Sequence, residues 1–258
     1  MTGFTFHRPG PPLDAFVDLI WRCDREPEPW AQERLLPEGS VELVVDLAAP
    51  ASVDVVAGPH TRFFLLDTTK RQRLVGVHFK PGGAFPFVQP PMHELRNIEA
   101  PLDALWGGVA REFRERLGEA SSDEKQFAIV EQVLTTRAAD RLRHHPAVAF
   151  GLREFTHVPH VRTIAEVSQR IGMSQRRFIE VFAEETGLTP KMFCRIRRFQ
   201  VAIRRAHKSA CIDWATLALD CGYFDQAHFI HDFREFSGLT PSAWAAQRTD
   251  HLNHVPIV

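Results

Sequence analysis

Two short segments of the chain carry polar side chains of the kinds that recognise flat, hydrogen-bonding ligands. The segment 174–180 reads SQRRFIE, and the segment 225–231 reads DQAHFIH. An arginine guanidinium donates two parallel hydrogen bonds, a glutamine amide both donates and accepts, and a carboxylate only accepts. If each segment is the start of a helix, these groups lie on the face opposite the phenylalanine. Both segments are therefore candidates for contacting a ligand with a patterned edge, such as a nucleic-acid base.

The two segments belong to an internal repeat, whose copies span Ile164–Pro190 and Trp214–Pro241. Ala165 and Gly172 recur fifty positions later, whereas Phe178 and the residues after it recur after fifty-one. One residue has therefore been inserted in the turn of the second copy. Each copy has the apolar spacing of two helices that meet across a glycine turn, which predicts a helix-turn-helix.

Start signals agree with this periodicity. Thr163 and Glu166 have the spacing of a capping box, and Ser174, Asp213 and Asp225 are good N-cap residues for the next three helices. A single copy would also fit an ordinary helical hairpin. Two copies in register favour a pair of helix-turn-helix motifs.

With both copies in view, residues from about 150 to 244 resemble the AraC/XylS family of bacterial transcriptional regulators. The most specific match is IDWATLALDCGYFDQAHFIHDFREFSGLTPSAW, which has the Gly-aromatic turn, the Phe-x-x-x-Phe helix and the Gly-x-x-Pro ending of the family. The resemblance implies two helix-turn-helix motifs joined by a long helix, with double-stranded DNA and RNA polymerase as partners. KMFCRIRRFQVAIRRAHK lies between the motifs and has the apolar stripe of a helix of about seventeen residues, or about 25 Å.

In this family, the third, sixth and seventh residues of the first recognition helix commonly face bases, here Arg176, Ile179 and Glu180. Arg176 can donate a bidentate pair of hydrogen bonds to guanine, and Gln226 can pair with adenine. The apolar side chain of Ala227 or Ile230 can contact a thymine methyl group. The full set of candidate base-reading residues is Gln175, Arg176, Ile179, Glu180, Gln226, Ala227, His228, Ile230 and His231.

Two of these residues depart from the family pattern, because many relatives have arginine at the positions of Glu180 and His231. Glu180 can accept from a cytosine amino group, or it can orient Arg176 or Arg177 through a helical ion pair. A phosphate contact by His231 would depend on pH.

Charge separates the two halves of the chain. Residues 153–248 hold 14 Lys and Arg against 10 Asp and Glu, while residues 1–152 hold 17 against 21. A net positive half suits phosphate neutralisation and predicts salt-dependent binding. The candidate phosphate contacts are Ser174, Arg177, Arg195, Arg197, Arg198 and Asp225. The alternative for arginines beside the core is pairing with acids of the same domain.

The first 101 residues have a different pattern. Leu13, Phe16, Val17 and Ile20 have helical spacing, which predicts an amphipathic helix that ends near Trp21. Short apolar runs bounded by Gly and Pro then predict strands at 40–47, 53–57, 62–66 and 74–79. Several short strands with such punctuation favour a small β-barrel or sandwich. Helical spacing returns at 102–117 and 127–142.

We therefore expect an α+β protein of three parts: a β-rich sensor domain at 1–101, a helical linker or dimerisation region at 102–149, and the double helix-turn-helix domain at 150–248. The family resemblance implies a cupin-like sensor, an effector of unknown identity and a homodimer. The expected function is sequence-specific transcription regulation. Two alternatives remain open. One is a sensing or protein-interaction module whose helix-turn-helix pair does not bind DNA specifically, and the other is an enzyme whose β-rich half does chemistry while the helical half regulates its own gene.

Other functions lack sequence support. No nucleophile elbow or phosphate loop is present, so we expect neither an enzyme nor a cofactor. His60, His78 and His93 lack tight ligand spacing, so we expect no metal site. The four cysteines form no CxxC pair and predict reduced thiols. Without an apolar stretch of 18 residues or a charged-then-apolar leader, we expect no membrane insertion and a cytoplasmic location.

Overall fold

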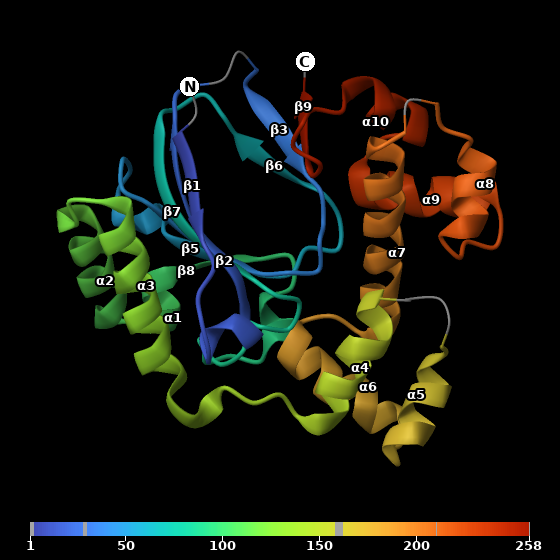
Figure 1. Cartoon of the computed structure of the whole chain (residues 1–258), viewed down its shortest axis with the longest axis horizontal. Coiled ribbons are helices and arrows are strands. Elements are labelled where there is room, and N and C mark those ends of the chain that lie inside the picture. The colour runs from blue at the N-terminus through green and yellow to red at the C-terminus, as the bar shows by residue number, and fades with distance from the viewer. Residues whose placement is uncertain (1–2, 28–29, 158–161, 210, 258) are drawn as a thin grey trace.

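The N-terminal part of the protein is built on two open β-sheets (Figure 1). The computed structural model describes residues 3–27, 30–157, 162–209 and 211–257. The larger sheet has the strand order β1 (Gly3–His7), β2 (Val17–Arg25), β7 (Gln72–Phe79), β4 (Glu42–Asp46), β5 (Val55–Ala57) and β8 (Glu99–Pro101), with antiparallel neighbours throughout. The smaller sheet has the order β6 (Phe64–Asp67), β3 (Gln32–Leu35) and β9 (His254–Ile257). Among the described residues the sheets do not close into a barrel.

The helix expected from Leu13 to Trp21 is wrong. Only Leu13–Ala15 forms a 3-10 turn, and β2 begins at Val17. The register of β2 against β7 shifts between Val17 and Leu19, as at a β-bulge. A bulge adds one residue, so side chains three apart face the same side of the sheet. Val17 and Ile20 are both buried for this reason, and their spacing imitates a helix.

The four predicted strands are present as β4, β5, β6 and β7, with ends shifted by a few residues. The sequence did not reveal β1, β3, β8 or β9. The first residues of β1 are exposed, β8 is three residues long, and β9 follows the helical half of the chain. None of these strands has a long alternating apolar pattern that would mark it.

Helices follow the larger sheet and cover one of its faces (Figure 1). They are α1 (Leu102–Trp106), α2 (Gly108–Glu119) and α3 (Asp123–Ala138). The expected helix at 102–117 is divided at Gly107, which has a φ of 58°. Trp106, Phe113 and Leu134 pack in the same core as the strands. The indole Nε1 of Trp106 donates to the carbonyl of Phe87 at 3.0 Å.

The C-terminal half is helical. It contains α4 (Pro146–His157), α5 (Ile164–Ile171), α6 (Gln175–Thr186), α7 (Pro190–His207), α8 (Trp214–Asp220), α9 (Gln226–Ser237) and α10 (Pro241–Gln247). The expected long connector is α7, with 18 residues. The domain boundary expected at residue 150 falls inside α4. In the described part of the chain, no helix is both long and apolar enough to cross a membrane.

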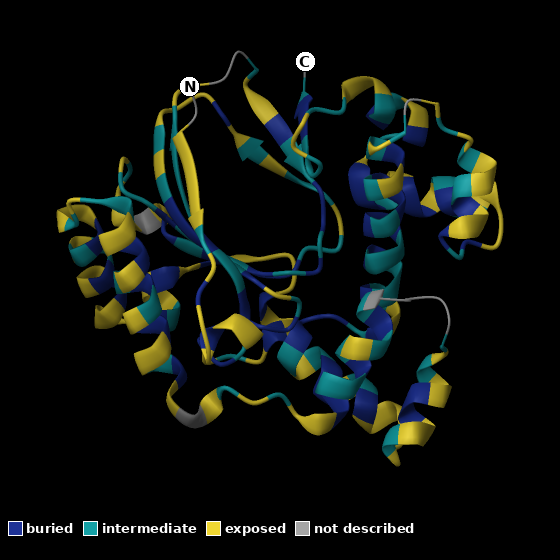
Figure 2. Cartoon of the chain, in the orientation of Figure 1, coloured by how far each residue is buried: buried dark blue, intermediate teal, exposed yellow. Residues whose placement is uncertain are grey.

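The two halves share a hydrophobic core and a sheet. Leu36, after β3, and Val255, in β9, are buried with the phenylalanines of α6, α7 and α9. From α7, the Gln200 amide donates to the carbonyl of Pro37 at 2.8 Å and to Asn253 Oδ1 at 3.0 Å. Figure 2 shows buried segments along β9 and along α7, which come from the smaller sheet and from the helical half. The last strand of the chain therefore ties the helical half to the β-rich half.

An ion cluster on the smaller sheet holds β9 in place. The carboxylate of Glu33 in β3 lies 3.0 Å from Nη1 of Arg25 and 3.0 Å from Nδ1 of His254 in β9. Burial would raise the pKa of Glu33, but the hydrogen bonds and positive charges of His254 and Arg25 outweigh burial and lower it to about 2. A lowered carboxyl pKa means that the charged form stabilises the fold.

We predict that Glu33→Gln lowers the free energy of unfolding at pH 7 by about 1.5–3 kcal/mol, since it removes a buried charge-assisted hydrogen-bond acceptor. The contribution of Glu33 is complete above its unfolded pKa near 4.5 and is lost as the pH falls toward 2. Denaturant unfolding should therefore show that the free energy of unfolding of the wild type falls as the pH is lowered through this window. The fall should be smaller for the variant. Glu131→Gln, at a half-exposed pair with His7, is the matched control and should change stability by less than about 1 kcal/mol. Equal effects of the two substitutions would contradict the role of Glu33.

Candidate nucleic-acid interface

Two helix-turn-helix units lie at opposite ends of α7 (Figure 1). The first consists of α5 and α6, and the second consists of α8 and α9. Gly172 and Gly222 stand in the two turns with φ angles of 72° and 78°, a conformation that favours glycine. The predicted pair of motifs is therefore present in the fold.

Side-chain caps fix where the helices begin, as expected from the sequence. Thr163 and Glu166 form the full capping box of α5. The Oγ of Ser174 accepts from the backbone of Arg177 at 3.3 Å. Asp213 and Asp225 cap α8 and α9 in the same manner. Because both recognition helices are capped, their first turns are fixed in space before any ligand binds.

Aromatic packing fixes the rotation of each recognition helix. In α6, Phe178 and Phe182 are buried, with ring centroids 5.7 Å apart. In α9, Phe229 and Phe233 are buried, with ring centroids 5.5 Å apart. Burial of these rings leaves the opposite face of each helix turned to solvent.

The outer face of α6 presents the expected residues. Gln175, Arg176 and Glu180 are exposed, with 92% of the Arg176 side chain accessible, and Ile179 is half-buried. Arg177, a candidate phosphate contact, is also exposed. The side chains of this face are thus free to meet a large ligand.

Glu180 holds both neighbouring arginines in the structure. Its carboxylate lies 3.1 Å from Nε of Arg176 and 3.5 Å from Nη1 of Arg177. Hydrogen bonding by Arg176 lowers the pKa of Glu180, so this carboxyl is charged at neutral pH. This geometry fits the alternative in which Glu180 orients Arg176 and Arg177 through ion pairs along the helix.

The outer face of α9 is less charged. Gln226 and Ala227 are exposed, and His228 and Ile230 are partly buried. His231 is 77% exposed, with Nε2 3.9 Å from the carboxylate of Glu235. Arginine is absent from the groove-facing positions of this helix, so its surface is nearly neutral.

Arg195, a candidate phosphate contact, is engaged inside the domain. Its Nη2 lies 2.6 Å from Asp232 and 2.5 Å from Glu235, both in α9. Burial alone would lower the pKa of Arg195, but the two carboxylates outweigh it and raise the pKa. This arginine therefore fixes α9 on α7, which is the intramolecular alternative that the sequence left open.

Arg197 and Arg198 also face inward in part. Burial lowers the pKa of Arg197, whose charge faces Glu38 of the N-terminal half. Nη1 of Arg198 donates to the carbonyl of Gly222 at 3.3 Å, and its guanidinium lies 5.1 Å from the Tyr223 ring centre. Arg198 thus supports the second turn. Ser174 and Asp225, the other two phosphate candidates, are exposed caps at the helix N-termini.

The sequence missed the residues that connect this interface to the rest of the protein. Gln200 is a buried amide within the apolar stripe of α7, and Glu185 of α6 pairs with His144 at 2.7 Å. For Gln200, the sequence signal was a polar residue inside an apolar stripe, and this signal did not reveal its hydrogen-bond partners.

No group of three potential metal ligands occurs among the described residues. His78 instead pairs with Glu42; burial disfavours the charged ring, but this carboxylate outweighs burial and raises the pKa of His78 to about 9.

Comparison with known families matches two separate parts of the chain. Residues 167–247 match a family described as a helix-turn-helix domain, and residues 5–101 match a family described as a domain of unknown function, DUF6597. No curated protein matches the chain.

Three solved structures are among those that match the chain. The C-terminal domain of AraT, a response regulator from Geobacillus stearothermophilus, is 20% identical, with a TM-score of 0.39 over 42% of this chain and 95% of that domain. A DNA-binding transcriptional dual regulator from Escherichia coli K-12 is 22% identical, with a TM-score of 0.33 over 40% of this chain and 94% of its own. ToxT from Vibrio cholerae O395 is 10% identical, with a TM-score of 0.42 over 97% of this chain and 98% of its own.

The helix-turn-helix match runs from within α5 to the end of α10 and includes both capped recognition helices. The chain therefore carries an N-terminal DUF6597 domain followed by a helix-turn-helix domain of the AraC type.

Proposed function

We propose that this protein regulates transcription by inserting α6 and α9 into successive major grooves on one face of DNA. The observation that carries the proposal is the pair of exposed recognition faces held at opposite ends of α7. A helix of 18 residues is about 27 Å long. A recognition helix lies at each end of α7, so the two recognition helices are separated by slightly more than the length of α7. This separation is close to one helical turn of DNA, which is about 34 Å or 10 bp.

Each recognition helix is assigned a different kind of readout. On α6, Arg176 donates a bidentate pair to guanine, and Glu180 keeps the guanidinium oriented. On α9, Gln226 pairs with adenine, and Ala227 contacts a thymine methyl group. Arg177 and the α6 cap Ser174 are assigned to the phosphates, whereas Asp225 caps α9 in the other unit and, as a carboxylate that only accepts hydrogen bonds, is assigned to fixing the start of that helix. Arg195 and Arg198 are assigned to positioning α9, because their guanidinium groups are already engaged.

An effector would act through a cleft between the two halves. The cleft has a volume of about 670 Å³ and is bounded by Lys80 and His78 from the β-rich half and by Arg153 and Arg197 from the helical half. A small polar molecule bound here would contact both halves at once. Such contacts would bias the position of the helical half, which supports the proposal of an effector-responsive regulator.

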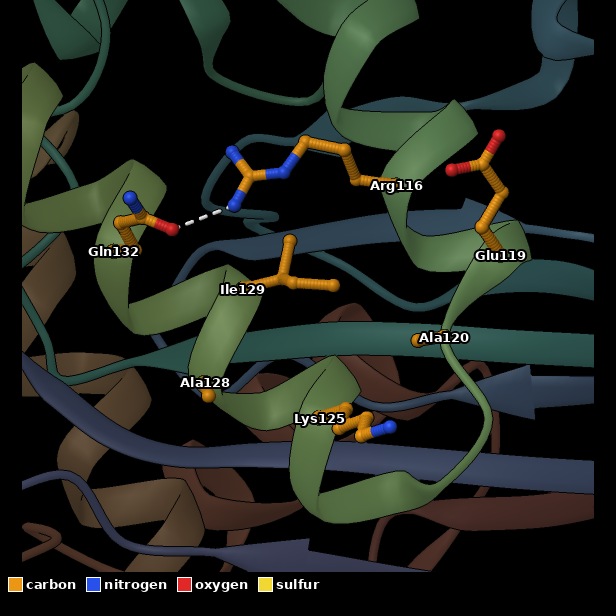
Figure 3. A pocket seen from close by; sticks show the side chains of 7 residues that line it. All are labelled: Arg116, Glu119, Ala120, Lys125, Ala128, Ile129 and Gln132. Carbon is orange, nitrogen blue, oxygen red and sulfur yellow. Dashed lines mark hydrogen bonds between the residues drawn. The ribbon is translucent and has the colours of Figure 1, made fainter.

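We further propose that the protein acts as a homodimer through α2 and α3. A shallow groove of about 440 Å³ lies between these helices, as Figure 3 shows, with Ile129 at its floor and Arg116 bonded to Gln132 at its rim. Val109 of α2 is 40% exposed. Two-fold pairing of this surface would place two copies on DNA and would leave RNA polymerase to meet the outer face of the bound complex.

Selection of bound duplexes from a random library, with the purified chain at two salt concentrations, tests the proposed function. We expect an enriched motif with two short elements about 10 bp apart, and weaker binding at the higher salt concentration. Binding without any sequence preference would instead support a module whose helix-turn-helix pair serves protein contacts.

Replacement of Arg176 by Ala should relax the preference for one base pair of the first element by roughly 1–3 kcal/mol, since a bidentate contact is lost. Affinities for the selected duplex and for duplexes mutated at that base pair measure this preference. Arg111→Ala, at an exposed position of α2, removes the same charge far from α6 and should leave the preference intact. An unchanged preference in the Arg176 variant would remove this residue from the base-reading set.

Replacement of Ile129 by Glu should weaken the dimer by at least about tenfold, because a carboxylate would be buried at the interface. Sedimentation equilibrium over a range of protein concentrations measures the change. Leu65→Glu, which places the same charge at an exposed position of β6, should leave the association constant unchanged. Equal association of the Ile129 variant and the wild type would exclude this surface as the interface.

A further inference from the structure

Phe224 is the most exposed large hydrophobic side chain among the described residues. Its exposure is 87%, and it lies in the turn between α8 and α9. An aromatic ring exposed in this way gains nothing from the hydrophobic effect in the free protein. Its position therefore calls for a physical explanation.

Phe224 is the residue inserted in the second helix-turn-helix. The amide of Met173 donates to the carbonyl of Ser168, and the amide of Tyr223 donates to that of Ala218, fifty positions later in both cases. Beyond the turn, the cap bonds at Ser174 and Asp225 are related by fifty-one positions. The extra residue must lie between Tyr223 and Asp225, and only Phe224 does.

The fold does not use the Phe224 ring for packing. Tyr223, the residue before it, already fills the space behind α9 and is 3% exposed. The Tyr223 ring centre lies 5.2 Å from that of Phe229 and 5.1 Å from the Arg198 guanidinium. Because Tyr223 already fills this space, the ring of the inserted Phe224 remains in solvent.

The ring stands at the end of α9 that enters the groove in the proposed function. Phe224 directly precedes the N-cap Asp225, and residues 224–227 are all exposed. In helix-turn-helix proteins, the N-terminal residues of the recognition helix contact base edges. Among base edges in the major groove, thymine offers an apolar group, its C5-methyl, to an aromatic side chain.

We propose that Phe224 is a specificity-determining residue that packs on the C5-methyl group of a thymine in the element read by α9. This assignment rests on the proposed function. The near neutrality of the α9 surface fits an apolar contact, whereas α6 presents the charged Arg176 and Arg177. The insertion therefore gives the two recognition helices different kinds of base preference.

Replacement of single thymines by deoxyuridine in the selected duplex tests the proposal, because it removes the methyl group and keeps every hydrogen bond of the base. For the wild-type protein, the dissociation constant should rise roughly fourfold at one thymine of the second element, as expected for about one buried methyl group. Phe224→Ala should bind the unmodified duplex roughly fourfold more weakly and should be insensitive to deoxyuridine at that thymine. Phe224→Leu keeps an apolar side chain and should retain most of the sensitivity.

Leu219→Ala is the matched control, since Leu219 is a 61% exposed apolar residue of α8 that precedes the same turn. It should keep the wild-type response to deoxyuridine. The proposal is overturned if no thymine of the second element responds, or if Phe224→Ala responds as the wild type does. Normal duplex binding by Phe224→Ala with loss of transcription activation would also overturn it and would assign the ring to RNA polymerase. Absence of any sequence preference in the wild type would be a failure of the proposed function itself, and this assignment would fail with it.

Discussion

The connecting helix α7 is the constraint on which the rest of the structure depends. Its apolar residues Ile196, Phe199 and Ile203 are fully buried between the two helix-turn-helix units. Within this fully described helix, only Lys191 and Arg205 are exposed. A helix packed on nearly all sides cannot rotate without disrupting several contacts at once. Its rotation therefore sets the direction in which both recognition helices face.

Packing of α7 also divides the arginines of the helical half into two groups. Arg195 and Arg198 lie where α7 meets α9 and the second turn, and their guanidinium groups hold those elements in place. Arg176 and Arg177 lie on the first turn of α6 and extend into solvent, restrained by Glu180. A net charge of +4 between residues 153 and 248 is thus a poor measure of the charge available to a phosphate backbone.

The same helix connects the helical half to the β-rich half. Gln200 bonds to Pro37 and Asn253, and a side chain placed at Gly39, which has a φ of 79°, would meet Ile196 of α7. The pairing of β9 with β3 adds a second connection from the end of the chain. The proposed effector cleft lies between the same two halves, so a molecule bound there would shift both recognition helices together.

The sequence by itself determined the helical half in detail. The repeat, the capping residues Thr163, Ser174, Asp213 and Asp225, and the length of α7 were all predicted correctly, because caps and helical periodicity are local properties of the chain. Tertiary structure decided the rest. The bulge after Val17 turned an apparent helix into β2, and the pairing of β9 with β3 joins residues more than 200 positions apart. Likewise, which arginines face solvent depends on carboxylates such as Asp232, and the exposure of the inserted Phe224 depends on Tyr223 filling the space behind it. Such contacts join residues that no local pattern relates, so only the folded chain could assign them.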